Sequence, residues 1–86
     1  MTRDLDIRVC IIEDDETIRE GYVYLIGNTP GYKVVGNYPS FEDAAKKIAA
    51  DDPDVILLDV ELPGISGIDA IPKIKKLVPE AYILIL

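Results

Sequence analysis

Short runs of consecutive apolar residues alternate along the chain with longer segments in which apolar residues recur every three or four positions. The runs lie at 7–12, 32–35, 55–58 and 82–86. Continuous apolar runs of this length are typical of strands in a parallel sheet that helices cover on both faces. The pattern therefore predicts a doubly wound α/β fold in the order β-α-β-α-β-α-β, with right-handed crossovers.

The three segments between the runs have the periodicity of amphipathic helices. Their apolar stripes are Ile18, Tyr22, Leu25 and Ile26 in the first, Phe41, Ala44, Ala45, Ile48 and Ala49 in the second, and Ile68, Ile71, Ile74 and Val78 in the third. Asp15, Ser40 and Ser66 are the predicted N-caps of these helices. Pro72 lies one turn into the third helix and has no N–H to donate, so we expect a distorted or late start there.

Composition narrows what such a domain can do. The chain has 86 residues, which make one small domain at most, and its formal charge is −7 from 9 basic and 16 acidic residues. An acidic surface cannot neutralise phosphates, so we do not expect direct nucleic-acid binding. With no histidine and one cysteine, the chain can form neither a His/Cys metal site nor a histidine-based catalytic site. The one kind of metal site that this composition allows is a hard cation held by oxygen ligands.

The remaining signals favour a reducing, aqueous compartment. Cys10 lies within an apolar run and is predicted to be a core residue rather than a nucleophile or half of a disulfide. No segment is apolar for long enough to span a bilayer, and residues 1–8 lack a signal-peptide core. We therefore expect a cytoplasmic protein that does not bind membranes.

Acidic side chains follow two of the predicted strands. Glu13 and Asp14 come directly after the first strand, and Asp59 comes directly after the third. In a doubly wound sheet, ligands bind beyond the carboxyl ends of the strands, where the strand order reverses. If the first and third strands are neighbours, their ends lie roughly 5 Å apart. The three carboxylates would then converge in one shallow pocket.

Two interpretations of these carboxylates compete. Carboxylates this close repel one another, so either some of their pKa values rise or a divalent cation such as Mg²⁺ binds between them. An aspartate beside such a cation can act as a nucleophile and form an aspartyl-phosphate. Taken singly, however, a strand-end aspartate is typically a turn or cap residue, and the acidic run 13–16 is typical of a solvated helix start. The joint placement at two strand ends favours the chemical interpretation.

Two separated motifs resemble the receiver domains of two-component response regulators. The segment VCIIEDDETIREG, residues 9–21, is similar to the family's first strand and acidic pair, and DVILLDVELPGISGID, residues 54–69, is similar to its phosphoacceptor strand and loop. Pro63 and Gly67 match the loop's characteristic proline and glycine. The amino-acid sequence of these segments is most similar to that of NarL/FixJ-type regulators, which carry a DNA-binding module downstream. The resemblance covers nearly the whole chain and implies a CheY-like, flavodoxin-like sheet with strand order 2-1-3-4.

The resemblance also implies a role for each matching residue. Asp59 would accept a phosphoryl group from a histidine kinase or a phosphotransfer protein. Asp14 and Asp59 would ligate Mg²⁺ directly, Glu13 would do so through water, and Glu61 would supply its backbone carbonyl. Such a domain is a phosphoacceptor rather than an enzyme that turns over a separate substrate.

The chain departs from the family's pattern at its end. The resemblance implies that a switch Ser or Thr, a fourth helix, a fifth strand ending in a lysine and a last helix would follow Leu86. We therefore interpret residues 1–86 as the N-terminal portion of a receiver domain, with the acceptor and metal ligands but without the readout. The run 82–86 would then form an exposed edge strand, which predicts self-association or domain swapping.

Three other functions compete with this one. A phosphohydrolase of the haloacid-dehalogenase type would also use Asp59 followed by Glu61, but its further lysine and acidic motifs have no match here. A flavodoxin-like FMN binder needs a phosphate cradle after the first strand, where this chain is acidic. A truncated or engineered receiver fragment that acts as a structural or assembly module without phosphotransfer remains the open alternative.

Overall fold

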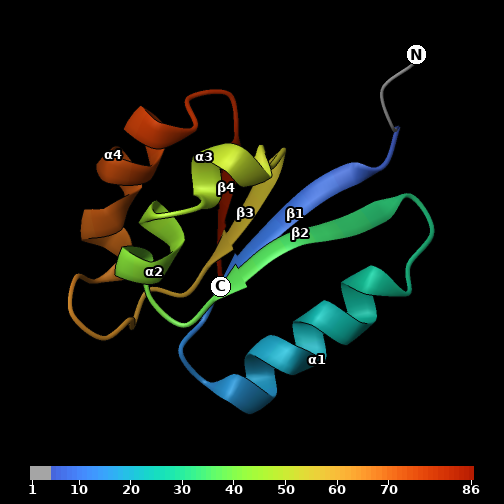
Figure 1. Cartoon of the computed structure of the whole chain (residues 1–86). Coiled ribbons are helices and arrows are strands. Elements are labelled where there is room, and N and C mark those ends of the chain that lie inside the picture. The colour runs from blue at the N-terminus through green and yellow to red at the C-terminus, as the bar shows by residue number, and fades with distance from the viewer. Residues whose placement is uncertain (1–4) are drawn as a thin grey trace.

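The computed structural model describes residues 5–86, and these residues form a four-stranded parallel sheet in the order β2-β1-β3-β4 (Figure 1). The strands are β1 Ile7–Ile12, β2 Tyr32–Tyr38, β3 Val55–Leu58 and β4 Tyr82–Ile85. The helices are α1 Glu16–Gly27, α2 Phe41–Ala45, α3 Ile48–Asp51 and α4 Gly67–Leu77. The predicted doubly wound α/β class and the strand order 2-1-3-4 are confirmed. Residues 1–4, which belong to the N-terminal segment examined for a signal peptide, lie outside the described residues.

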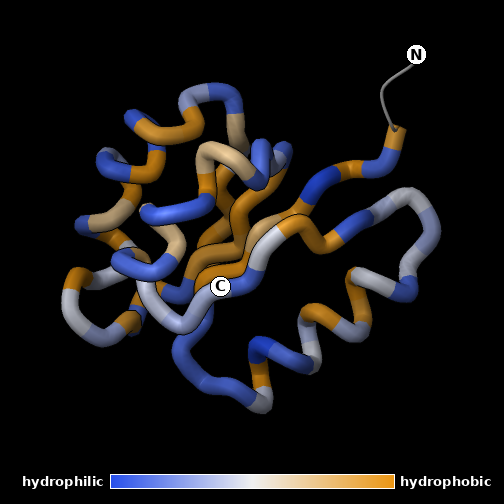
Figure 2. The backbone as a smooth tube through the Cα atoms, in the orientation of Figure 1, coloured by the Kyte–Doolittle hydropathy of each residue, from blue (hydrophilic) through white to orange (hydrophobic). Residues whose placement is uncertain are grey.

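The main core lies between the sheet and the helices α2, α3 and α4, which share one side of the sheet in Figure 1. Its fully buried side chains include Cys10, Ile12, Ile56 and Leu58 from the two central strands. Figure 2 shows the central strands as a continuous hydrophobic band inside a more polar periphery. Burial raises the pKa of the Cys10 thiol to about 12, and the nearby Asp51 carboxylate adds to that effect. Cys10 is therefore an unreactive core residue, as predicted.

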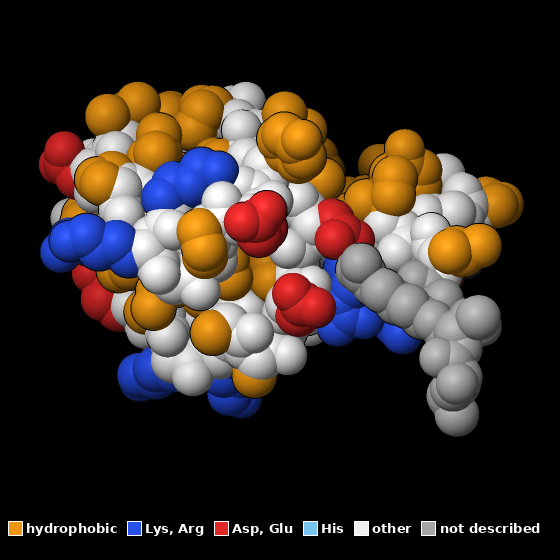
Figure 3. Space-filling view, turned by 90° about the horizontal axis from the view of Figure 1, so that it is seen from above, with side chains coloured by type: hydrophobic (Ala, Val, Ile, Leu, Met, Phe, Trp, Pro, Cys, Tyr) orange, Lys and Arg blue, Asp and Glu red, His pale blue; other side chains and the backbone are white. Residues whose placement is uncertain are grey.

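The opposite face of the sheet is covered less completely, because α1 packs there against β1 and β2 and buries none of its residues fully. An apolar groove of about 250 Å³ remains on this face, and its lining residues are Ile7, Val9, Ile26, Tyr32, Val55, Leu57 and Leu84. Figure 3 shows hydrophobic side chains on both sides of a hollow between the main body and the end where β1 begins. The predicted α1 stripe is only half-buried, and Leu25 is 64% exposed.

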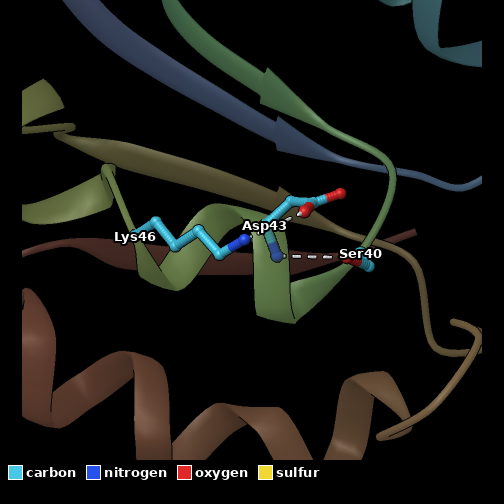
Figure 4. A network of polar contacts seen from close by, with 3 residues as sticks. All are labelled: Ser40, Asp43 and Lys46. Atoms are coloured by element: carbon cyan, nitrogen blue, oxygen red, sulfur yellow. Dashed lines mark hydrogen bonds and ion pairs between the residues drawn. The ribbon is translucent and has the colours of Figure 1, made fainter.

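The predicted N-caps are confirmed. The side-chain oxygens of Asp15, Ser40 and Ser66 each accept a hydrogen bond from the backbone N–H three residues further on, at 3.0–3.2 Å. Figure 4 shows the Ser40 cap of α2 together with a 4.0 Å ion pair between Asp43 and Lys46. Because both charged side chains are largely exposed, we assign this ion pair little weight in stability.

One helix prediction was wrong, and the late start allowed for another helix is not observed. The second helix is divided into α2 and α3, because the Lys47 N–H donates to the Ala44 carbonyl at 3.0 Å in a tighter turn. The third helix does not start late, since α4 begins at Gly67 on the Ser66 cap and continues through Pro72. The carbonyl that loses its partner to Pro72 belongs to Ile68, which is 58% exposed and open to water. That exposure also removes Ile68 from the predicted apolar stripe.

The strands run close to the predicted segments. β2 extends to Tyr38, three residues beyond its predicted end, and β4 ends at Ile85 rather than Leu86. In the part of the chain that the structure describes, no helix combines the length and apolar character needed to cross a membrane.

Candidate metal-binding carboxylate site

The carboxyl ends of β1 and β3 lie side by side at the centre of the sheet. Ile12 pairs with Leu58 in register, and the Asp59 N–H donates to the Ile12 carbonyl at 3.0 Å. Glu13 and Asp14 leave the sheet directly beside Asp59. The three carboxylates each offer one oxygen, and these oxygens all lie within 4.8 Å of one another. The structure thus brings together the three side chains that the sequence placed at two strand ends.

Glu13 is the buried member of the cluster, with 6% of its surface exposed. Burial raises the pKa of its carboxyl group above the usual range, and the neighbouring Asp59 and Asp14 carboxyls raise it further. The Asp15 N–H, which donates to Glu13 Oε2 at 3.2 Å, acts in the opposite direction and lowers the pKa. A cation beside Glu13 would favour its ionised form and so offset this cost.

The other two carboxylates are open to solvent. Asp14 is exposed and Asp59 is half-buried, so a ligand can reach both. Asp59 Oδ1 accepts a hydrogen bond from the Glu61 N–H at 3.1 Å, which orients the carboxylate toward the start of the following loop. The exposed Glu61 side chain is not a member of the carboxylate cluster. Its predicted contribution through the backbone carbonyl stays a prediction.

The chemistry of the donor set fits a hard divalent cation. Glu13, Asp14 and Asp59 supply oxygen atoms only, and two of the three side chains are accessible. Mg²⁺ prefers oxygen ligands, keeps several waters, and is typically bound through one or two carboxylates plus a phosphate group. An open site with few carboxylates therefore suits Mg²⁺ better than an enclosed cage would.

Two residues support the site in ways that the sequence did not reveal. The half-buried Arg19 donates from Nη1 to the backbone carbonyl of Glu13 at 2.9 Å, which holds the end of β1. Gly67 was noted only as a family motif, yet it packs directly against the backbone of Asp59 and Val60. The only sequence signal for Arg19 was the position of a basic side chain about one helical turn after Glu13 and Asp14. The close packing of Gly67 depends on tertiary structure.

A parallel sheet of order 2-1-3-4 with acidic residues at the ends of its two central strands defines a CheY-like fold with a carboxylate site at its topological switch point. The chain belongs to the response regulator receiver domain family, because the sequence model of that family matches residues 9–86.

The relatives carry this domain in different proteins. The chain is 35% identical to response regulator GacA of Pseudomonas viridiflava over 78 residues, which are 91% of this chain and 36% of the relative. It is also 35% identical to protein-glutamate methylesterase/protein-glutamine glutaminase 2 of Paramagnetospirillum magneticum, over 92% of this chain and 22% of that protein. The chain thus spans about a third or less of these relatives.

Solved structures show the same fold. A LuxR-family two-component response regulator from Aurantimonas sp. SI85-9A1 superposes with a TM-score of 0.84 at 35% identity. The superposition covers 93% of this chain and 57% of that regulator. The predicted resemblance to NarL/FixJ-type receiver domains is therefore confirmed, because LuxR-family and NarL receiver structures are among the matches.

Proposed function

We propose that this chain is a phosphoacceptor receiver domain that takes a phosphoryl group onto Asp59 in a Mg²⁺-dependent reaction. The observation that carries the proposal is the cluster of Glu13, Asp14 and Asp59, whose oxygens lie within 4.8 Å of one another. Membership of the receiver family supports it. The accessibility of Asp59 also supports the proposal, because a phosphoryl donor must approach this nucleophile. Glu13 can be buried, since it needs only to face the cation.

Each residue has a separate task in the proposed reaction. An Asp59 carboxylate oxygen attacks phosphorus and forms an O–P bond, while the bond to the donor breaks and the donor leaves with the electron pair. Mg²⁺, when bound, supplies positive charge that offsets the repulsion between the carboxylate and the phosphoryl oxygens. Asp14 and Asp59 would ligate the ion directly, Glu13 through water, and Glu61 through its backbone carbonyl. The hydrogen bond from the Glu61 N–H holds Asp59 in one orientation.

The partners follow from the same proposal. The donor would be a histidine kinase or a phosphotransfer protein, and the reaction would take place in the cytoplasm. Two solved structures among the matches are described as LuxR-family regulators, one of them as DNA-binding. We therefore propose that residues 1–86 are the N-terminal portion of a receiver domain, and that the whole protein controls a DNA-binding output module outside this segment.

Phosphorylation by a small donor tests the proposal. The chain is incubated with acetyl phosphate and Mg²⁺, and its intact mass is measured. We expect a single phosphoryl adduct that disappears in Asp59→Asn, because the amide is a poor nucleophile. Asp69→Asn is the matched control, since Asp69 is an exposed aspartate that lies outside the cluster.

Two outcomes would contradict the proposal. One is an adduct that persists in Asp59→Asn, and the other is a folded wild-type chain that neither binds Mg²⁺ nor acquires an adduct. The second outcome would leave the alternative of a structural or assembly module without phosphotransfer.

A specific observation favours assembly as a second proposal for the 86-residue chain. Among the described residues, β4 pairs only with β3, and its Tyr82, Leu84 and Ile85 side chains are exposed. An uncharged, exposed edge strand is a template for pairing with another chain. We propose self-association or domain swapping through β4. Sedimentation of wild type and Leu84→Lys tests it, and a monomeric wild type at high concentration would contradict it.

A further inference from the structure

Gly67 is the first residue of α4, and it is buried against the strand end that carries Asp59. Its N–H donates to the Val60 carbonyl at 2.9 Å. A Cβ at this position would lie 2.7 Å from the Val60 Cα and 2.9 Å from the Asp59 carbonyl carbon, and closer still to the Asp59 carbonyl oxygen. All three atoms belong to the backbone, so no side-chain rotation can make room for a methyl group.

The backbone of Asp59 is confined from two sides. On one side its N–H is bonded to β1 through the Ile12 carbonyl at 3.0 Å. On the other side Gly67 packs against its carbonyl. A methyl group on Gly67 must therefore displace either the Asp59–Val60 backbone or the start of α4. The first movement turns the Asp59 carboxylate relative to Glu13 and Asp14, and the second removes the packing that holds the Asp59 backbone in place.

We propose that Gly67 is a positioning residue that sets the cation-size selectivity of the carboxylate site; this inference rests on the proposed function above. Mg²⁺ requires near-ideal octahedral ligands at short range, whereas Ca²⁺ accepts a variable number of oxygens in flexible geometry. A displaced Asp59 therefore weakens Mg²⁺ binding more than Ca²⁺ binding. Without Gly67, the site keeps its three carboxylates but loses its preference for the smaller ion.

Calorimetric titration of wild type and Gly67→Ala with Mg²⁺ and Ca²⁺ tests the inference. We expect the Mg²⁺ affinity to fall about tenfold or more, which is the range for residues that orient metal ligands. The Ca²⁺ affinity should fall by a clearly smaller factor, so that the ratio of the two affinities changes. In the metal-free protein, the backbone amide NMR signals of residues 59–61 should shift, which reports the displacement without any metal.

Gly64→Ala is the matched control, because Gly64 lies in the same loop and also excludes a side chain. Its φ of +76° strains any alanine, but its Cβ would meet the flexible Glu42 side chain, with Oε2 at 3.0 Å, rather than the Asp59 backbone. Gly64→Ala should therefore reduce stability and leave the ratio of Mg²⁺ to Ca²⁺ affinity unchanged. An unchanged ratio in Gly67→Ala, or an equal change in both variants, overturns the inference.

Failure of the proposed function is distinguishable from failure of this inference. A folded wild type that does not bind Mg²⁺ overturns both. A wild type that binds Mg²⁺, together with a Gly67→Ala variant of the same selectivity, overturns only the role of Gly67.

If circular dichroism shows Gly67→Ala to be unfolded, Ser66→Ala replaces it. That change removes the cap on the Asp69 N–H and loosens the same helix start without adding atoms. Selectivity should then change in the same direction by a smaller factor, and no change overturns the inference.

Discussion

The two strand ends that form the carboxylate site are held in place in different ways. At the end of β1, polar contacts between residues close in sequence fix the backbone. The Glu13 carbonyl accepts from Arg19 Nη1 at 2.9 Å, Glu13 Oε2 accepts from the Asp15 N–H at 3.2 Å, and Asp15 caps α1. Two 3.0 Å backbone bonds join this end to distant segments, one from the Glu13 N–H to the Tyr38 carbonyl and one from the Asp59 N–H to the Ile12 carbonyl.

At the end of β3, packing between segments fixes the backbone instead. The loop after Asp59 is anchored by the buried Leu62 side chain, which belongs to the main core. Gly67 then closes the loop against Asp59 and Val60. The β1 end should therefore be more sensitive to the loss of hydrogen-bonding groups, whereas the β3 end should be more sensitive to changes in side-chain volume.

The largest effect is expected from Leu62→Ala. Leu62 is 8% exposed and packs in the core, so its truncation should lower the free energy of unfolding by about 2–5 kcal/mol. The freed loop should also lower the Mg²⁺ affinity. Urea denaturation and metal titration measure the two effects. Ile68→Ala, at a 58% exposed position nearby, is the control and should cost no more than about 0.5 kcal/mol. Equal losses in the two variants would show that Leu62 is not an anchor.

The next effect is the stabilisation by Mg²⁺, which Glu13→Gln should reduce. At a hundredfold excess over its Kd, Mg²⁺ should raise the free energy of unfolding of wild type by about 2.7 kcal/mol. The pKa of Glu13 is raised in the folded state by burial and by its carboxylate neighbours. Ionisation of Glu13 therefore costs stability, and metal-free wild type should lose stability as the pH rises above the unfolded-state pKa of glutamate and through the raised folded-state pKa.

Thermal unfolding at several pH values, with and without Mg²⁺, measures both parts of this prediction. Metal-free Glu13→Gln should be more stable than wild type near neutral pH and should lack that pH dependence. If wild type instead gains stability across this pH window, the assignment of the raised pKa to Glu13 is wrong.

Much of this fold follows from local sequence. The apolar runs located the four strands of the described residues, and the caps Asp15, Ser40 and Ser66 located the starts of α1, α2 and α4. Glu13 and Asp14 were placed correctly because they follow β1 directly. Asp59 joined them only through the pairing of β1 with β3, which the family resemblance implied and the strand order confirmed.

The errors arose where tertiary contacts decide the structure. The break between α2 and α3 is accompanied by long-range hydrogen bonds from Arg8 to the end of α3. Arg8 Nε donates to the Asp52 carbonyl at 2.9 Å, and Arg8 Nη2 donates to the Asp51 carbonyl at 2.6 Å. The Tyr38 hydroxyl also donates to the Asp51 carboxylate. These contacts hold the end of α3 in a position that a continuous stripe of apolar residues does not encode. The supporting role of Gly67 escaped prediction for the same reason, whereas Arg19 makes a contact close in sequence, with the Glu13 carbonyl, that helix periodicity does not indicate.

A smaller effect should separate the helix caps that follow the two strand ends. Asp15→Ala and Ser66→Ala each remove one cap and should each cost about 1 kcal/mol in urea denaturation. Asp15→Ala should reduce the Mg²⁺ affinity more than Ser66→Ala does, because hydrogen bonds hold the β1 end whereas the packing of Gly67 holds most of the β3 end. Asp15→Ser keeps a capping oxygen and removes the negative charge. This variant therefore separates the effect of the capping hydrogen bond from the effect of the charge. Equal losses of Mg²⁺ affinity in the two alanine variants would remove the distinction between the strand ends.

The smallest effect should come from a glycine that packs against nothing. Gly21 lies within α1, and a Cβ there would meet no atom within 4 Å. Gly21→Ala should therefore stabilise the protein by roughly 0.5–1 kcal/mol, since alanine loses less backbone entropy in a helix. Because the β1 end is held by side-chain contacts before Gly21, the Mg²⁺ affinity should not change. Urea denaturation and metal titration check both statements. A fall in Mg²⁺ affinity would mean that α1 acts on the site through more than Asp15 and Arg19, and a loss of stability would mean that α1 packs against the sheet differently.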